Sequence, residues 1–359
     1  MLLPLPLGIS VHFNERIFNK VDQDSPSWTG CLCIERSMDM AFEMSIEDLK
    51  TYMGRSPRPD DFDQYWERAL KELEEQGTEY ELVPAEFQTE LAECFHLYFT
   101  GVGGARVHCK MARPRQQAGR KGPGFAIFHG YSSDSGDWLE KASYAAHGFT
   151  VLALDCRGQG GLSEDNLNVK GTTIRGHVIR GLDDPNPDNL YYRNVFLDTV
   201  QTVRILMSMD QVDPERVGVY GQSQGGALAV ACAALEPRVK SLVPVHPFLS
   251  DYKRAWETNI TSSAYEELVY YFRMFDPNHK REDEVFYRLG YIDIQNLADR
   301  IKAKVLWITG LSDPICPPST QFAAYNKIQS EKDVLLYHEY GHEYLPYLSD
   351  RLFQVMSEL

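Results

Sequence analysis

The stretch that decides the fold of this chain runs from residue 216 to residue 230: Arg-Val-Gly-Val-Tyr-Gly-Gln-Ser-Gln-Gly-Gly-Ala-Leu-Ala-Val. Residues 216–220 have the short apolar pattern of a buried strand, and residues 225–230 have the small apolar side chains of a buried helix. Ser223 therefore lies in a sharp turn between a strand and a helix. Such a turn strains the backbone and presents its side chain clear of its neighbours.

Two glycines flank Ser223 in this turn, because Gly221 and Gly225 lie two residues before and two residues after it. Small residues are needed at both places, since the backbone passes close to itself there. The five-residue pattern alone is common and weakly informative, but the strand before it and the helix after it make it specific. We therefore predict that Ser223 is a nucleophile activated by a neighbouring base.

Outward from this turn, the chain alternates short apolar runs with segments of helical length. The runs are residues 124–128, 150–154, 217–220, 242–245, 305–309 and 334–337. Strands buried on both faces and separated by helices form mostly parallel sheets covered on both sides. Ahead of them, residues 62–73 predict an amphipathic helix, and residues 95–100 and 106–111 predict an antiparallel hairpin. The sequence predicts an α/β fold.

The acid and base that serve such a nucleophile follow it in the order Ser, Asp or Glu, His, each on a loop after a later strand. Asp313 follows the run 305–309, and His342 follows the run 334–337. By itself, Asp313 is equally well explained as a turn residue before Pro314, and a lone loop histidine is more often structural. Together, the three predict a catalytic triad of Ser223, Asp313 and His342 on an α/β-hydrolase fold.

An oxyanion hole requires two backbone N–H groups, one from the residue after the nucleophile and one from the loop after an early strand. Gln224 supplies the first. The loop His129-Gly130-Tyr131 follows the run 124–128 directly, and we predict that the amide of Tyr131 supplies the second. His129 is expected to be a buried structural residue, because the triad already has its base.

A zinc site is the rival interpretation of the same region, because residues 338–342 match the pattern H-E-x-x-H. That pattern binds zinc only on a helix, where both histidines share one face. Here it continues from a strand-like run and contains Gly341, and no third ligand follows at a recognisable spacing. We therefore predict no metal.

Composition restricts the partners of the protein. The formal net charge is −15, which opposes binding to nucleic acid or to anionic membrane surfaces. Seven cysteines, several of them in apolar runs, are typical of reduced core residues and favour a cytoplasmic location. No apolar run approaches the ~20 residues that span a bilayer.

The chain is predicted to hold one domain over residues 40–359, preceded by an N-terminal appendage over residues 1–39. Its opening residues, Met1 to Leu7, are apolar but contain two prolines and no basic residue, which disfavours a signal peptide. We expect this appendage to be disordered or to result from a mis-assigned start. The aromatic-rich segment 252–275 has two explanations, a lid over the site or packing of helices onto the core.

Three segments carry a resemblance to a known family: Arg157-Gly158-Gln159, residues 221–226 and His342-Glu343. Residues 247–252, 275–277 and 316–322 extend it. On these segments the chain, from about Met44 to its end, resembles carbohydrate esterase family 7, the acetyl xylan esterases and cephalosporin-C deacetylases of the α/β-hydrolase superfamily.

The resemblance implies a serine esterase that removes acetyl groups from small substrates such as xylo-oligosaccharides, other acetylated sugars and cephalosporin C, without a cofactor. It implies the same triad and the same oxyanion amides, and we expect Arg157, Gly158 and Gln159 to support the loops of the site. It also implies a homo-hexamer. A peptidase of the prolyl-oligopeptidase type and a non-catalytic binding module with a hydrolase fold remain as alternatives.

Overall fold

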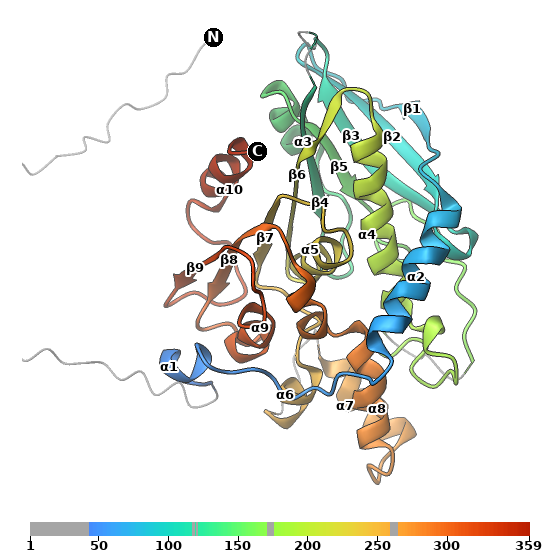
Figure 1. The fold of residues 1–359 in the computed structure, drawn as a ribbon, viewed down its shortest axis with the longest axis vertical. Helices are drawn as coiled ribbons and strands as arrows, with labels where there is room; N and C mark the ends of the chain where they lie inside the picture. The colour runs from blue at the N-terminus through green and yellow to red at the C-terminus, as the bar shows by residue number, and fades with distance from the viewer. Residues whose placement is uncertain (1–42, 117–118, 120, 171–175, 259–264) are drawn as a thin grey trace, which may run out of the picture. The chain divides into compact units, whose positions relative to one another are not determined.

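The structure, a computed structural model, describes residues 43–359 apart from residues 117–118, 120, 171–175 and 259–264 (Figure 1). The predicted N-terminal appendage, residues 1–39, lies outside the described residues. Within the described part, one nine-stranded sheet organises the chain. Its strands are β1 (Glu81–Pro84), β2 (Ala92–Thr100), β3 (Arg106–Pro114), β4 (Gly122–Phe128), β5 (Thr150–Leu154), β6 (Val212–Gln222), β7 (Ser241–Val245), β8 (Lys304–Gly310) and β9 (Lys332–Tyr337).

The order of the strands across the sheet is β1-β2-β3-β5-β4-β6-β7-β8-β9. Strands β5, β4, β6, β7, β8 and β9 pair in parallel, whereas β1, β2 and β3 pair with their neighbours antiparallel. All six predicted apolar runs and the predicted hairpin are confirmed as strands. The edge strand β1 was not predicted, because it has only four residues and no buried side chain.

Helices cover both faces of the sheet, as the alternation of side chains along β4 shows. Ala126 and Phe128 belong to the core that α2 (Phe62–Gln76), α4 (Tyr191–Ser208) and α5 (Gln224–Leu235) complete. Phe125 and Ile127 point to the opposite face, which α3 (Trp138–Ala146) and α10 (Leu348–Ser357) cover. Figure 1 shows the first group in front of the sheet. After Gln224, helix α5 carries small or apolar side chains on every side, and all its residues are buried.

The segment between β7 and β8 contains three helices, α6 (Tyr252–Glu257), α7 (Glu266–Phe275) and α8 (Glu282–Leu289). Within the aromatic-rich residues 252–275, four described aromatic side chains are buried in the core shared with α5, which favours packing as their role: Tyr252, Tyr265, Tyr271 and Phe272. The other helices are α1 (Ile46–Leu49) and α9 (Pro318–Tyr325). Single 3₁₀ turns occupy Val102–Gly104, Pro187–Asn189, Gly290–Ile292, Ile294–Asn296 and Ala298–Arg300.

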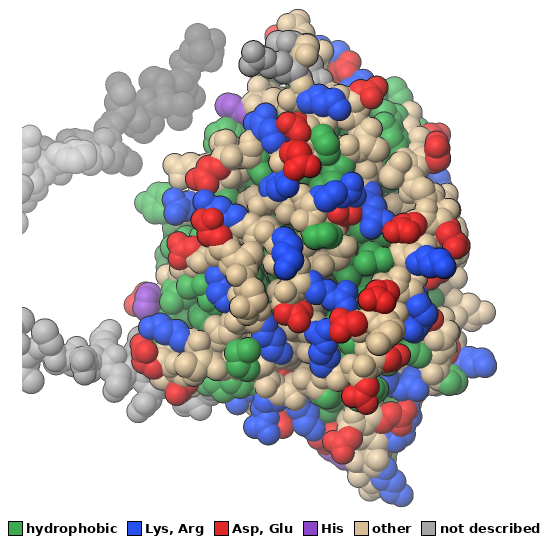
Figure 2. Space-filling view, in the orientation of Figure 1, with side chains coloured by type: hydrophobic (Ala, Val, Ile, Leu, Met, Phe, Trp, Pro, Cys, Tyr) green, Lys and Arg blue, Asp and Glu red, His purple; other side chains and the backbone are tan. Residues whose placement is uncertain are grey.

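Among the described residues, no helix has the length and apolar character needed to cross a bilayer. On the face drawn in Figure 2, basic and acidic side chains are interspersed. That arrangement does not form the continuous basic surface that binding of a phosphate backbone needs.

Candidate active site

The backbone of Ser223 is held in the conformation predicted for a nucleophile turn. Ser223 has φ 56° and ψ −120°, between the end of β6 and the start of α5. A Cβ atom on Gly221 would lie 2.2 Å from the backbone of Gly225, and one on Gly225 would lie 1.9 Å from the carbonyl oxygen of Phe128. Both glycines are therefore required by close backbone approach, and they let the turn pack against the end of β4.

Hydrogen bonds to neighbouring strands hold this turn in place. The amide of Ser223 donates to the carbonyl of Val245 at 2.8 Å, and the carbonyl of Ser223 accepts from the amide of Phe248 at 3.1 Å. The turn is thereby tied to the end of β7, so that a strained residue is fixed by its surroundings.

Asp313 and His342 meet beyond the ends of β8 and β9. Nδ1 of His342 lies 2.8 Å from Oδ2 of Asp313. The other carboxylate oxygen, Oδ1, accepts hydrogen bonds from the amides of Ile315 at 2.8 Å and Cys316 at 2.9 Å. Asp313 is fully buried, whereas the side chain of His342 is about one-fifth exposed. The carboxylate can therefore orient the imidazole and stabilise its protonated form, while the ring remains accessible.

Contacts between the loops after β8 and β9 set the distance between these two residues. The amide of Leu311 donates to the carbonyl of Tyr337 at 2.9 Å, and the amide of Ser312 donates to that of Tyr340 at 3.0 Å. A Cβ atom on Gly310 would lie 2.2 Å from the carbonyl oxygen of Tyr340. The two loops are thus fixed to each other just before Asp313 and His342.

His246 is a second imidazole at this site, and no sequence pattern pointed to it. It lies directly after β7, with Nδ1 at 3.5 Å from Oδ2 of Asp313 and its ring centre 5.2 Å from that of His342. Burial lowers its pKa to about 4, so the ring is neutral near pH 7. Nδ1 accepts a hydrogen bond from the amide of Gly310 at 3.4 Å, which places the proton on Nε2.

The thiol of Cys316 lies near the side chain of Ser223. This thiol is buried, and burial raises its pKa well above its usual value, so that it stays protonated. Cys316 also donates its amide to Asp313, and it therefore lies close to both Ser223 and Asp313. It was not predicted as a site residue.

The two predicted oxyanion residues lie on adjoining segments. Gln224 is the first residue of α5, and Tyr131 follows β4, whose last residue Phe128 pairs with Gly221 of β6. Neither amide donates a hydrogen bond to any residue in the described part of the chain. Free N–H groups at a helix start and in an adjoining loop are the donors that an oxyanion requires.

The side chain of Gln224 is buried and joins a network of polar groups. Its Oε1 accepts from the hydroxyl of Tyr192 and from Nε2 of Gln159, both at 2.8 Å. Gln159 in turn accepts at Oε1 from the amide of Ser132, 2.9 Å away, and its Nε2 donates to the hydroxyl of Tyr191 at 3.1 Å. Gln159 therefore connects the Tyr131 loop to the start of α5.

Arg157 is buried and forms a bidentate ion pair with Asp198 of α4, at 2.7 Å and 2.5 Å. Its carbonyl accepts from the hydroxyl of Tyr191. Gly158 has φ 67°, in the left-handed region, and lets the chain turn toward Gln159. These contacts place Arg157 where it can hold the loop of Gln159, and they direct its guanidinium to Asp198 rather than to the triad.

The H-E-x-x-H segment does not have the geometry of a zinc protease. Strand β9 ends at Tyr337, and residues 338–342 form a loop rather than a helix. Within the described residues, His246, Asp313 and His342 bring three possible ligand atoms within 4.8 Å of one another. The hydrogen bond between His342 and Asp313, with the neutral ring of His246 beside them, accounts for that cluster without a metal.

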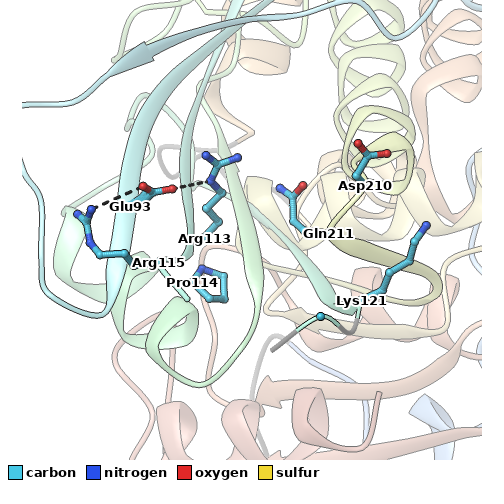
Figure 3. A pocket seen from close by; sticks show the side chains of 8 residues that line it. Glu93, Arg113, Pro114, Arg115, Lys121, Asp210 and Gln211 are labelled. Carbon is cyan, nitrogen blue, oxygen red and sulfur yellow. Dashed lines mark hydrogen bonds and ion pairs between the residues drawn. The ribbon is translucent and has the colours of Figure 1, made fainter. Parts of the chain in front are cut away.

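A surface depression of about 590 Å³ lies at the other end of the sheet (Figure 3). Its lining residues are Glu93, Arg113, Pro114, Arg115, Gly119, Lys121, Asp210 and Gln211. It adjoins the start of β4, where Gly122 pairs with Val212, whereas Ser223, Asp313 and His342 follow the ends of the parallel strands. Ligands of parallel α/β sheets bind at those ends, so this depression is not the active site.

The sheet order and the strained turn define the chain as an α/β hydrolase. The family model described as acetyl xylan esterase (AXE1) matches residues 38–359. The chain therefore belongs to the acetyl xylan esterase family and is a carboxylic ester hydrolase, which confirms the predicted resemblance.

Individual relatives agree with this assignment. An acetyl xylan esterase from Thermoanaerobacterium sp. JW/SL YS485 is 54% identical, with 88% of this chain and 99% of that chain covered and a TM-score of 0.86. The acetyl xylan esterase from Paenibacillus sp. R4 is 34% identical over the same shares, with a TM-score of 0.83. Acetyl esterase Axe7A of Xylanibacter ruminicola is 27% identical over 88% of this chain and 71% of its own length.

The peptidases are more distant. An acylaminoacyl peptidase from Pyrococcus horikoshii is 19% identical, with a TM-score of 0.55, and this chain covers 42% of it. That likeness shows a shared fold and nothing about the reaction.

Proposed function

We propose that the chain hydrolyses acetyl esters of small substrates with Ser223 as nucleophile, His342 as base and Asp313 as the orienting acid. The observation that carries this proposal is the 2.8 Å contact between Nδ1 of His342 and a fully buried Asp313. That contact fixes the imidazole so that Nε2 is left to take a proton, at the same edge of the sheet as the strained Ser223.

In the first half of the reaction, the Ser223 hydroxyl gives its proton to Nε2 of His342. The oxygen attacks the acetyl carbonyl. Collapse of the tetrahedral adduct breaks the bond to the alcohol, which leaves with the proton from His342, and an acetyl-enzyme remains. In the second half, water gives a proton to His342 and attacks the acetyl group, and acetate leaves as Ser223 regains its proton.

The amides of Tyr131 and Gln224 would hold the negative oxygen of each tetrahedral adduct. Both are backbone donors that bind no described residue, so they need no rearrangement when charge develops. On the scale of known oxyanion-hole variants, loss of one such donor raises the barrier by about 3 kcal/mol.

The substrate class that we propose is an acetylated sugar such as a xylo-oligosaccharide, with cephalosporin C as a further acetyl ester to test. Family membership and the acetyl xylan esterases among the relatives support this class. Release of acetate from acetylated xylo-oligosaccharides, compared with acetyl, butyryl and octanoyl aryl esters, tests it. A preference for the octanoyl ester contradicts an acetyl esterase.

Substitution of the nucleophile is the direct experiment. Ser223→Ala is expected to lower kcat on an aryl acetate by roughly 10⁴-fold or more, because no other group can form the acyl-enzyme. Ser143→Ala is the matched control, since Ser143 lies exposed on α3 and is expected to leave the rate unchanged. Activity retained in Ser223→Ala overturns the proposal.

We propose that the enzyme works as a hexamer in the cytoplasm, with its cysteines reduced. The free and buried state of the five described cysteines supports a reducing compartment. The hexamer rests on the family resemblance, and light scattering of the purified protein tests it against a monomer or a dimer.

A further inference from the structure

Glu267 is a buried carboxylate on α7 with an unusual set of partners. Its side chain accepts four hydrogen bonds from donors on two other segments. Oε1 accepts from the hydroxyl of Tyr131 at 2.5 Å and from the amide of His177 at 3.2 Å. Oε2 accepts from the amides of Val178 at 2.7 Å and Ile179 at 3.3 Å. Glu267 is only 3% exposed, so these donors replace the water that a carboxylate otherwise binds.

The backbone of the segment 176–179 is shaped to reach this carboxylate. Gly176 has φ 83°, and a Cβ atom there would lie 1.9 Å from Cδ of Glu267, so a side chain at that position would displace the carboxylate from its present place. The ring of His177 stacks on Tyr191 at 4.4 Å and meets the ring of Tyr131 edge to face at 5.7 Å. Helix α7, this segment and the Tyr131 loop therefore converge on one carboxylate.

The phenol of Tyr131 is fully engaged by the same group of residues. Its hydroxyl donates to Glu267 and accepts from the amide of His177 at 3.0 Å. The phenol is therefore committed to this network, whereas the amide of the same residue binds nothing among the described residues. The ring also contacts Phe248, whose amide donates to the carbonyl of Ser223.

A tyrosine side chain has only two rotatable bonds, so fixing the phenol restricts the backbone of Tyr131. The other side of the loop is held by the bond from the amide of Ser132 to Gln159. The peptide that carries the Tyr131 amide is thus held from its side chain and from the residue that follows. Donors held in advance of the reaction stabilise developing charge most effectively.

We propose that Glu267 is a positioning residue of the oxyanion hole, which holds the Tyr131 amide in its productive direction by binding the Tyr131 phenol. Glu267 touches no reacting atom, and its effect on the reaction passes through Tyr131. This inference rests on the oxyanion role proposed above for that amide. It gives the segment between β7 and β8 a part in catalysis, although α7 carries no triad residue.

The test compares Glu267→Gln, Tyr131→Phe and the double variant, with kcat and KM measured on an aryl acetate. In Glu267→Gln, an amide nitrogen replaces one carboxylate oxygen and therefore faces the two hydrogen-bond donors that this oxygen accepts from. In Tyr131→Phe, the hydroxyl that donates to Glu267 is removed. Each single variant is expected to lower kcat about tenfold with KM within twofold, because binding of the ester itself is not affected. The double variant is expected to be no slower than the slower single variant, since both remove the same link.

Tyr271→Phe is the matched control. It lies on the same helix, and it also loses one hydroxyl bonded to a carboxylate, that of Asp183 at 2.7 Å, but it does not contact the Tyr131 loop. Its kcat is expected to equal that of the wild type. A phenylboronic acid forms an adduct with Ser223 that places an oxygen in the oxyanion hole. Its affinity should fall in the variants whose kcat falls, and it should be unchanged in the control.

Unchanged kcat in both single variants, or losses that multiply in the double variant, overturns the proposal. A raised KM with unchanged kcat also overturns it, because that result would indicate a substrate-binding role. Tyr131→Phe tests the same link if Glu267→Gln does not fold. Failure of the proposed function is distinct, because it would appear as activity in Ser223→Ala rather than as a change in the positioning variants.

Discussion

At the scale of single residues, Gly225 has the least room of the residues around the nucleophile. A Cβ atom there would overlap the carbonyl of Phe128, and that atom is backbone and cannot rotate away. Gly225→Ala must therefore push the end of β4 away from α5, and β4 leads directly into the Tyr131 loop. We expect a loss of stability of about 1–3 kcal/mol, typical of overpacking, and a kcat at least tenfold lower.

The measurements that check this prediction are urea unfolding and steady-state kinetics on the same preparations. Gly148→Ala is the control, because Gly148 has φ 96° but a Cβ atom added there would meet no other atom within 4 Å. It should cost about 1 kcal/mol through backbone strain alone and leave kcat unchanged. Wild-type kinetics in Gly225→Ala would show that the turn tolerates a side chain.

His246 gives a prediction about pH. Burial lowers its pKa from the ordinary 6.5 to about 4, with the charge of His342 adding to the decrease and that of Asp313 opposing it. The unfolded chain therefore binds a proton at this residue between those pH values while the folded chain does not. Stability must fall as the pH is lowered from 6.5 toward 4, and His246 contributes about 3 kcal/mol of that fall.

Urea unfolding at several pH values, with wild type and His246→Asn, measures this contribution. Asparagine suits the left-handed backbone at this position, where φ is 42°. His279→Asn is the control for the substitution itself, because His279 has a similar φ of 51° and its side chain is about half exposed. The stability difference between wild type and His246→Asn should shrink as the pH falls. His177, whose pKa burial also lowers to about 4, contributes equally to both proteins.

At the scale of elements, the strands were predictable because each is an apolar run bounded by loops. The meeting of Asp313 and His342 was predictable for a related reason, since the ends of parallel strands converge at one edge and bring residues that are far apart in the sequence together. Strand β1 was not predictable, because its four residues are half or fully exposed and carry no periodic pattern.

The partners of the triad were not predictable, because nothing local marks them. Glu267 occurs next to Glu266 at the start of an amphipathic helix, where acidic residues usually face solvent. Only the packing of α7 against residues 176–179 shows that its carboxylate is buried. His246 is a single histidine that follows β7. Its contact with Asp313 depends on how β7 and β8 pair. Tertiary contacts decide both roles.

At the scale of the whole molecule, the burial of the cysteines predicts how many thiols react in the native protein. The chain has seven cysteines, and the five in the described part are free and buried: Cys94, Cys109, Cys156, Cys232 and Cys316. Burial raises the pKa of all five thiols, and only the thiolate attacks a thiol reagent. In the folded protein these five should react only when the structure opens.

Titration with a coloured aromatic disulfide should therefore show at most two fast thiols in the native enzyme, those of Cys31 and Cys33, and seven after denaturation. A variant with both replaced by serine is the control, and it should show none before denaturation and five after it. The slow phase of the wild type should accelerate with urea, because each buried thiol becomes accessible only through opening. A third fast thiol in the native enzyme would contradict the buried state of the core cysteines, and mass spectrometry of the labelled protein would identify which of the five it is.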